Sequence, residues 1–229
     1  LNNNQLTGEI PSTIGNLTNL TDLRLNNNQL SGEIPQEVCD LIESNNLNMD
    51  YILTGNDLIN TCEEPSICDG LTEVELWGVY YDIENTTEID LWNQGLTGSI
   101  PPEIGCLTNL LLLTVGYNQL TGEIPPEIGN LTNLQELTLN GNQFIGEIPP
   151  EIGNLTNLTL LNLPHNQFIG EIPPEIGNLT VLRFFSLYNN QLSGEIPSEI
   201  GNLPYLETIF FHDNQLTGEI PSEIGQLFN

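Results

Sequence analysis

The chain has 229 residues, of which 31 are acidic and only 2 are Lys or Arg, so its formal net charge at pH 7 is −29. With so few cations it cannot neutralise phosphates, which excludes nucleic acid and anionic membranes as partners. No apolar run is long enough to cross a membrane, so we do not expect membrane insertion of this segment.

One sequence motif recurs with a period of 24 residues. It places prolines at Pro11 and Pro35, and then at Pro101, Pro125, Pro149, Pro173, Pro197 and Pro221. A fixed period of this length, with regularly spaced Leu and Ile and a fixed Asn, indicates a solenoid in which each repeat packs on its neighbours. We therefore expect a stack of coils.

Residues 134–149 illustrate one repeat. Three leucines are predicted to point inward from a short strand, namely Leu134, Leu137 and Leu139. The residues between them are predicted to point outward, namely Gln135, Glu136 and Thr138. Neighbouring copies would cover the apolar side, because strands about 4.8 Å apart pair into one parallel sheet.

The turn after each strand also has a fixed pattern. An asparagine follows the strand at Asn118, Asn142, Asn166, Asn190 and Asn214. Its amide can bond backbone groups of the turn, so we expect a buried ladder of these side chains. Phe144 or Leu120, and then Ile148, are expected to fill the interior. Pro149 with Pro150 predicts a short, tight helical turn on the convex side.

The consensus LxGxIPxxIGNLxNL resembles the plant-type subclass of leucine-rich repeats, known from plant receptor ectodomains, polygalacturonase inhibitors and microbial surface proteins. The resemblance covers most of the chain. It implies an α/β repeat solenoid: a right-handed coil with a parallel β-sheet on the concave side and short 3-10 helices and turns on the convex side. For function it implies only a binding or scaffolding surface, because such solenoids serve many partners.

The repeat is interrupted once. Pro35 and Pro101 are 66 residues apart, which is not a multiple of 24. Residues 36–46 predict a short amphipathic helix, and the segment from Cys39 to Cys62 resembles the terminating cap of these solenoids. We place this cap at about residues 36–62.

Residues 71–92 resemble the opposite element, a starting cap, which we place at about residues 67–92. Trp77-Gly78-Val79 and a second strand near residues 88–92 predict a hairpin there. A cap that ends one array would thus stand directly before a cap that begins another. Residues 1–66 would be the last part of one solenoid, and residues 67–229 the first part of the next.

Four cysteines lie near the two caps, which indicates disulfides in an oxidising compartment and leaves three connectivities open. We favour Cys39 with Cys62, stapling the terminating cap, and Cys68 with Cys106, tying the starting cap to the first full repeat. The family's starting cap usually has a Cys just after the WGV text, where this chain has Tyr80. No CxxC pair occurs, so a thiolate metal site is not expected.

Much of the negative charge is periodic. One column is Glu123, Glu147, Glu171, Glu195 and Glu219, and a second is Glu127, Glu151, Glu175, Glu199 and Glu223. Like charges roughly 5 Å apart repel by about 1 kcal/mol per pair even in water, so salt or divalent cations would relieve the repulsion. A Ca²⁺ ladder along the first column is one interpretation. A solvated acidic face at high ionic strength is the one we favour, because no DxDxDG-type loop is present.

Seven asparagines begin an Asn-x-Ser/Thr sequon: Asn16, Asn19, Asn85, Asn130, Asn154, Asn157 and Asn178. In a secreted protein they can carry glycans, although GNLTN is also part of the repeat. Asn85 is the sequon most independent of the repeat. An alternative interpretation of this part of the repeat is a regular ice-binding array, formed by Thr132, Thr156 and Thr180 with Asn130, Asn154 and Asn178.

Outward positions of the strands vary between repeats, and a specific partner would be recognised there. Apolar residues occupy four of them, Leu112, Leu160, Phe184 and Phe210, and they are joined after the strand by Tyr117, Tyr188, His165 and His212. Aligned across the strands they would form an apolar, aromatic stripe on the concave face, which is the candidate contact site. The alternative is plain β-propensity, because aromatic residues fit a pleated sheet.

The two ends of the chain are nearly in phase. Leu1 occupies the repeat position of Leu139 and Asn229 that of Asn133, so five residues would complete the period. Two interpretations are open: the chain is the subunit of a head-to-tail polymer, or it is a piece of a longer tandem protein.

Three functions follow, all without catalysis, since no Ser or Cys nucleophile has a partner at a recognisable spacing. We expect an extracellular or cell-surface structural or adhesive protein, assembled as a filament or tandem fibre by end-to-end stacking. The alternative is a ligand-binding ectodomain of the receptor or inhibitor type, with a protein or glycan ligand on the concave face. Ice binding is the third. No cofactor is expected, and Ca²⁺ on the first glutamate column is the one candidate.

Overall fold

The computed structural model describes residues 1–62 and 67–226. The chain divides into two compact units, Leu1–Ser66 and Ile67–Asn229, each with its own hydrophobic core. We call them the first and the second unit. Their assignment to two successive solenoids stays a prediction.

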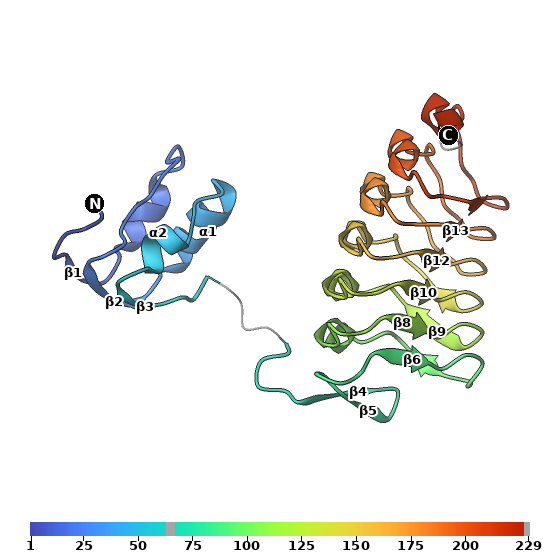
Figure 1. Ribbon diagram of the computed structural model, residues 1–229, viewed down its shortest axis with the longest axis horizontal. Coiled ribbons are helices and arrows are strands. Elements are labelled where there is room, and N and C mark those ends of the chain that lie inside the picture. Colours follow the sequence, from blue (N-terminus) through green and yellow to red (C-terminus); the bar gives the residue numbers. More distant parts are fainter. Residues whose placement is uncertain (63–66, 227–229) are drawn as a thin grey trace. The chain divides into compact units, whose positions relative to one another are not determined.

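The second unit is a stack of coils, each one repeat long (Figure 1). Its main sheet has the order β14-β13-β12-β10-β8-β6 and is parallel throughout. The strands are β6 (Glu88–Asp90), β8 (Leu112–Thr114), β10 (Glu136–Thr138), β12 (Leu160–Asn162), β13 (Phe184–Ser186) and β14 (Thr208–Phe210). Each residue is paired with the residue 24 positions away, as for Leu113 with Leu137, because the sequence period sets the register. The predicted leucine-rich-repeat solenoid with a parallel sheet is confirmed.

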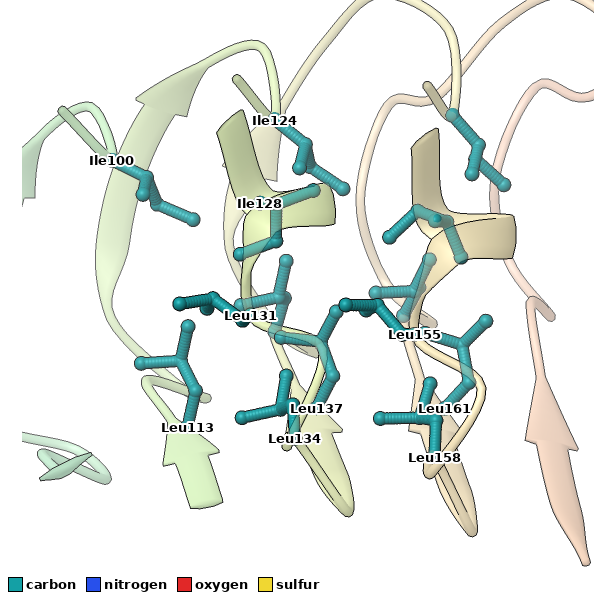
Figure 2. Close-up of a cluster of buried hydrophobic side chains, with 14 of the residues drawn as sticks. Ile100, Leu113, Ile124, Ile128, Leu131, Leu134, Leu137, Leu155, Leu158 and Leu161 are labelled. Atoms are coloured by element: carbon teal, nitrogen blue, oxygen red, sulfur yellow. The ribbon is translucent and has the colours of Figure 1, made fainter. Parts of the chain in front are cut away.

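The core of this unit consists of columns of identical positions. Leu113, Leu137 and Leu161 are completely buried one behind the other, and the residues above them repeat in the same way (Figure 2). Burying one Leu contributes about 1.5–3 kcal/mol. Since all these leucines belong to one core that runs through the repeats, neighbouring repeats supply the cover that a single repeat lacks.

The asparagine ladder ties adjacent repeats together. The Asn142 side-chain nitrogen donates to the carbonyl oxygens of Val115 (2.9 Å) and Leu139 (3.0 Å), while its oxygen accepts from the Leu120 backbone N–H (3.0 Å). The same three bonds recur at Asn118, Asn166 and Asn190. The predicted buried ladder is confirmed for these repeats.

A second, short ladder follows the turn. It comprises β7 (Thr97–Gly98), β9 (Gln119–Gly122) and β11 (Gln143–Phe144), in the order β11-β9-β7. Beyond it each coil makes one turn of 3-10 helix after a proline in extended conformation. These turns are η2 (Pro102–Cys106), η3 (Pro126–Asn130), η4 (Pro150–Asn154), η5 (Pro174–Asn178), η6 (Ser198–Asn202) and η7 (Ser222–Gln226). The fixed φ of proline favours this helical start, as the sequence predicted.

The predicted hairpin exists but between other strands. It joins β4 (Glu73–Leu76) to antiparallel β5 (Val79–Asp82) through Trp77 and Gly78. Both turn residues have positive φ, 51° and 82°, which a two-residue type I′ turn requires. The strand at residues 88–92 was expected to complete the hairpin, and this was wrong: β6 pairs in parallel with β8, because Ile89 is in register with the apolar Leu113 one period later.

The first unit contains a parallel sheet of the order β1-β2-β3, with β1 (Thr7–Gly8), β2 (Gln29–Glu33) and β3 (Asp57–Ile59). Its other elements are η1 (Ser12–Asn16), α1 (Gln36–Ser44) and α2 (Asp50–Leu53). The helix predicted at residues 36–46 is therefore present. It begins after Pro35, where the other repeats form a 3-10 turn, and buries Val38, Leu41 and Ile42.

Each unit contains one disulfide. Cys39 of α1 is bonded to Cys62, and Cys68 is bonded to Cys106 of η2, which are the pairs favoured above. Tyr80, at the position where related caps have a cysteine, instead donates a hydrogen bond from its hydroxyl to Glu75 Oε2 (3.0 Å). This bond raises the pKa of Tyr80 above its usual value.

Candidate functional site

The outward side of the main sheet carries two columns of side chains. The first is Glu88, Leu112, Glu136, Leu160, Phe184 and Thr208, and the second is Asp90, Thr114, Thr138, Asn162, Ser186 and Phe210. Leu112, Leu160 and Phe184 thus share one column, but Phe210 belongs to the other. Glu136 lies between Leu112 and Leu160, so the predicted continuous apolar stripe is interrupted.

The four residues predicted after the strand also fall into two columns. Tyr117 and His165 occupy a turn position with φ of 54°, whereas Tyr188 and His212 lie one position earlier in their repeats. Trp92 occupies the position of Tyr188 in the first repeat. We did not single it out from the sequence, although the period alone would have placed it on this face.

Five of the predicted residues form one connected cluster, which we call the aromatic patch: His165, Phe184, Tyr188, Phe210 and His212. The His212 ring stacks on Tyr188 with centroids 4.6 Å apart, and His165 meets the same ring edge-on at 4.9 Å. Phe184 and Phe210 are 6.0 Å apart, and Phe210 lies 6.3 Å from Tyr188. Phe210 remains 42% exposed, so the patch is a continuous aromatic surface that is open to a partner.

Two small residues of the second column, Thr138 and Ser186, are buried. Ser186, which pairs with Phe210 across β13 and β14, is completely buried, and its hydroxyl has no hydrogen-bond partner. Thr138 is only 8% exposed although it points outward as predicted, because short side chains in the middle of a sheet are shielded by their neighbours. An unpartnered buried hydroxyl is a feature that sequence patterns do not reveal.

A positive charge borders the aromatic patch. Arg183, next to Phe184, forms an exposed ion pair with Glu207 of the adjacent repeat, and its guanidinium lies 5.7 Å from the centre of the Tyr205 ring. It is the only Arg or Lys of residues 67–229. The sequence shows that positively charged residues are rare, and the position of Arg183 directly before Phe184 of β13 places this one beside the aromatic patch.

Leu112 and Tyr117 lie apart from the aromatic patch, at the other side of Glu136. Tyr117 instead contacts Trp92, with ring centroids 4.7 Å apart and an interplanar angle of 49°. The predicted stripe therefore consists of two aromatic clusters separated by a charged repeat.

The first glutamate column lies against backbone rather than forming an isolated row. A Cβ at Gly146 would be 2.7 Å from Glu123 Cγ, and the same contact recurs at Gly170, Gly194 and Gly218 with the next three glutamates. Among residues 1–62 and 67–226, no group of three or more His, Cys, Asp or Glu side chains is placed to hold a metal ion. The Ca²⁺ ladder stays a prediction.

The sequon asparagines are all exposed. The Asn157 amide donates to the Thr132 carbonyl oxygen (2.8 Å), and that of Asn85 to Asp82 Oδ1 (2.9 Å). The threonines of the suggested ice-binding array, Thr132, Thr156 and Thr180, are exposed as well. Glycosylation and ice binding both stay predictions.

Comparisons with known proteins agree with this architecture. The family model described as Leucine Rich Repeat matches residues 1–17, 19–41, 85–107, 109–131, 133–155, 157–179, 181–203 and 205–227. No curated protein matches the chain. In the part of the chain that the structure describes, no helix combines the length and the apolar character needed to cross a membrane.

Several solved structures are similar over most of the chain. The LRR ectodomain of the Arabidopsis thaliana membrane receptor kinase GASSHO1/SCHENGEN3, in complex with CASPARIAN STRIP INTEGRITY FACTOR 2, is 33% identical with a TM-score of 0.62, over 96% of this chain and 30% of that chain. The Arabidopsis receptor kinase HAESA, in complex with the peptide hormone IDA and the co-receptor SERK1, is 34% identical with a TM-score of 0.62, over 100% and 35%. The BIR3–SERK2 complex from Arabidopsis thaliana is 31% identical with a TM-score of 0.52, over 71% and 84%. The chain thus spans about a third of the length of the first two.

Proposed function

The chain belongs to the leucine-rich repeat family, and from this membership we propose that it is an extracellular domain that binds a protein or peptide on the concave face of its second unit. The aromatic patch carries this proposal. Aromatic side chains are the usual anchors of protein interfaces, because they bury a large area at a small cost in conformational entropy. Phe184, Tyr188 and Phe210 offer three such anchors within two adjacent repeats.

Two further observations support an extracellular binding role. The chain has two disulfides, Cys39–Cys62 and Cys68–Cys106, and disulfides persist in oxidising compartments such as the cell exterior. The similar GASSHO1/SCHENGEN3 structure is an LRR ectodomain, and the HAESA structure contains a peptide hormone and a co-receptor. These neighbours favour the ligand-binding alternative over the filament, for which the comparisons offer no support. The filament, like the absence of enzymatic activity, stays a prediction.

The proposal is tested by selecting linear peptides from a random library on the intact chain and measuring their dissociation constants with variants. Phe184→Ala and Phe210→Ala are each expected to weaken binding about 30-fold, the usual loss at an aromatic hot spot. Ile169→Ala is the matched control, because Ile169 is a similarly exposed apolar side chain (48%) outside the concave sheet.

Two outcomes would contradict the proposal. Selected peptides that bind the Phe210→Ala variant as tightly as the unaltered chain would show that the patch is not the contact site. Peptides that lose affinity equally with Ile169→Ala would point to a general apolar attraction.

A further inference from the structure

The second aromatic cluster lies at the other end of the concave face. Trp92 and Tyr117 are 43% and 50% exposed and pack on each other across adjacent repeats, with their ring planes tilted by 49°. Two glycines make room for them: a Cβ at Gly116 would be 2.7 Å from Trp92 Cζ3, and one at Gly141 would be 3.2 Å from Tyr117 Cδ1. A side chain at position 116 would therefore clash with the Trp92 ring, and one at position 141 would crowd the Tyr117 ring.

The backbone at Tyr117 is unusual as well. Its φ of 54° is a left-handed conformation. The equivalent position in the other repeats of the second unit also has a positive φ and is occupied by Asn93, Gly141, His165, Asn189 and Asp213. Such a φ is uncommon for Asn, Asp and His and a clear outlier for a large aromatic residue. This strained backbone position holds the Tyr117 ring against the Trp92 ring.

A buried polar atom without a partner lies at the same place. The Asn140 side chain is 6% exposed, and its Oδ1 has no hydrogen bond. The Cβ position of Gly116 is 2.5 Å from this oxygen and 2.7 Å from Trp92 Cζ3, so the oxygen lies beside the indole ring. A buried carbonyl oxygen normally has a donor, which the described residues do not supply here.

Three carboxylates lie on the same side of the sheet as the two rings. The nearest to Trp92 in sequence is Asp90, whose Oδ1 accepts a hydrogen bond from the Trp92 backbone N–H (3.2 Å). Glu88 and Glu136 both flank Leu112 across the sheet, and Asp90 is paired with Thr114. All three carboxylates are exposed. Arg183, the only Arg or Lys of this unit, belongs to the β13 repeat next to the aromatic patch and not to these repeats.

Each of the two arginines of the chain lies over an aromatic ring and pairs with a carboxylate. Arg24 lies 4.7 Å over the Tyr51 ring and pairs with Asp22 at 2.9 Å, and Arg183 lies over Tyr205 and pairs with Glu207. A cation is attracted to the face of an aromatic ring, and a nearby carboxylate strengthens the contact. Trp92 and Tyr117 present rings and carboxylates together without any cation of their own.

We propose that Trp92 and Tyr117, with Asn140 and the carboxylates of Glu88, Asp90 and Glu136, form a subsite for a Lys or Arg side chain of the ligand. The proposal rests on the proposed function, because it assigns the chemistry of one ligand residue. The exposed rings receive the cation and the carboxylates select for positive charge, while the buried Asn140 Oδ1 adds a partial negative charge beside the indole. The partner is therefore a basic segment that also carries apolar anchors for the aromatic patch.

The subsite can be tested without the natural ligand. The chain has two tryptophans, so its NMR spectrum contains two indole N–H signals, and Trp92→Phe identifies the relevant one. We expect N-acetyl-lysine methylamide and N-acetyl-arginine methylamide to shift the Trp92 signal saturably. N-acetyl-norleucine methylamide, which lacks the charge, should not do so.

Matched variants separate a site from general electrostatic attraction. Glu88→Gln and Glu136→Gln are each expected to weaken the lysine probe about 3-fold at low salt. Glu199→Gln removes the same charge from the convex turn η6 and should change nothing. Tyr117→Asn, which suits the local backbone, should abolish saturation while the chain stays folded.

A shift that is linear in probe concentration, or that norleucine reproduces, would overturn the proposal, as would equal losses with Glu88→Gln and Glu199→Gln. Saturation by neutral oligosaccharides instead of the cations would replace it with a glycan site. If the lysine and arginine probes do not bind while the affinity of library peptides still depends on Phe210, the subsite is wrong and the proposed function is supported. If the probes bind at Trp92 but no peptide is selected, the subsite is supported and the proposed function is wrong.

Discussion

Tyr117 combines a structural cost with an exposed position on the concave face. An L-residue in the left-handed region is less stable than in the right-handed one by roughly 1–2 kcal/mol, and Asn tolerates this region best after Gly. Tyr117 is held there at a φ of 54° and is half exposed, so its ring contributes little to the core. Strain retained at a surface position is a reason to look for a function.

We therefore expect Tyr117→Asn to stabilise the second unit by about 1 kcal/mol and to raise its melting temperature by about 2–4 °C. The measurement is thermal unfolding followed by circular dichroism. Tyr80→Asn is the control, because Tyr80 is also exposed but has no positive φ. A melting temperature that falls with Tyr117→Asn would show that the Trp92 contact outweighs the backbone strain.

At the scale of elements, one amide group in each turn holds two repeats together. Asn142 closes three hydrogen bonds with backbone groups of its own and the preceding repeats, and it is 8% exposed. Removing the side chain leaves buried donors and acceptors unpaired, and each such group costs about 1–3 kcal/mol. The ladder thus makes adjacent coils cooperative.

Asn142→Ala is expected to destabilise the second unit by about 2–4 kcal/mol in urea unfolding. Asn214→Ala should cost less, because Asn214 makes similar bonds but is only partly buried, so water can replace its amide. Equal losses at the two positions would mean that burial does not determine the strength of the ladder.

The contact between the glutamate column and the glycines is a second property of the repeat. Gly146 and Gly98 both have positive φ, 76° and 88°. A Cβ added at Gly146 would meet the Glu123 side chain, whereas a Cβ added at Gly98 would have no atom within 4 Å. Alanine therefore introduces the same backbone strain at both positions and a clash at one.

We expect Gly146→Ala to cost more stability than Gly98→Ala, by about 1–2 kcal/mol, measured by urea unfolding. Adding Glu123→Ala to Gly146→Ala should remove the difference. If the double variant is no more stable than Gly146→Ala alone, the cost arises from the backbone and not from the glutamate.

At the scale of the whole molecule, the chain consists of two compact units with separate cores and one disulfide each. We propose that the first unit ends one solenoid, with α1 and α2 as its terminating cap, and that the second begins another, with the β4–β5 hairpin as its starting cap. Helices suit a terminating cap, because a polar-backed element has to cover the last repeat.

Separate units predict separate stabilities. Cys39→Ser with Cys62→Ser should destabilise the first unit by about 2–5 kcal/mol, the usual effect of removing a native disulfide, and leave the second unchanged. Hydrogen exchange followed by mass spectrometry reports on peptides of each unit in the same sample. A parallel loss of protection in residues 67–226 would show that the two units fold as one body.

By itself the sequence determined the repeat, its register and its core. The period of 24 residues with inward Leu and Ile leaves one arrangement that buries them, and the fixed Asn and Pro specify the turns locally. It also determined the helix after Pro35, because the apolar positions of residues 36–44 follow the helical period. These features depend on residues that are close in sequence or exactly one period apart.

Only the tertiary structure decided which outward residues meet. The stacking of His212 on Tyr188 and the approach of Trp92 to Tyr117 over Gly116 depend on side-chain directions in neighbouring coils. The predicted partner of the hairpin was wrong for a similar reason: β4 pairs with β5, whereas β6 pairs with β8 in the register that places Ile89 beside Leu113. Periodicity fixes where a side chain stands, whereas its contacts are set by the residues beside it in space.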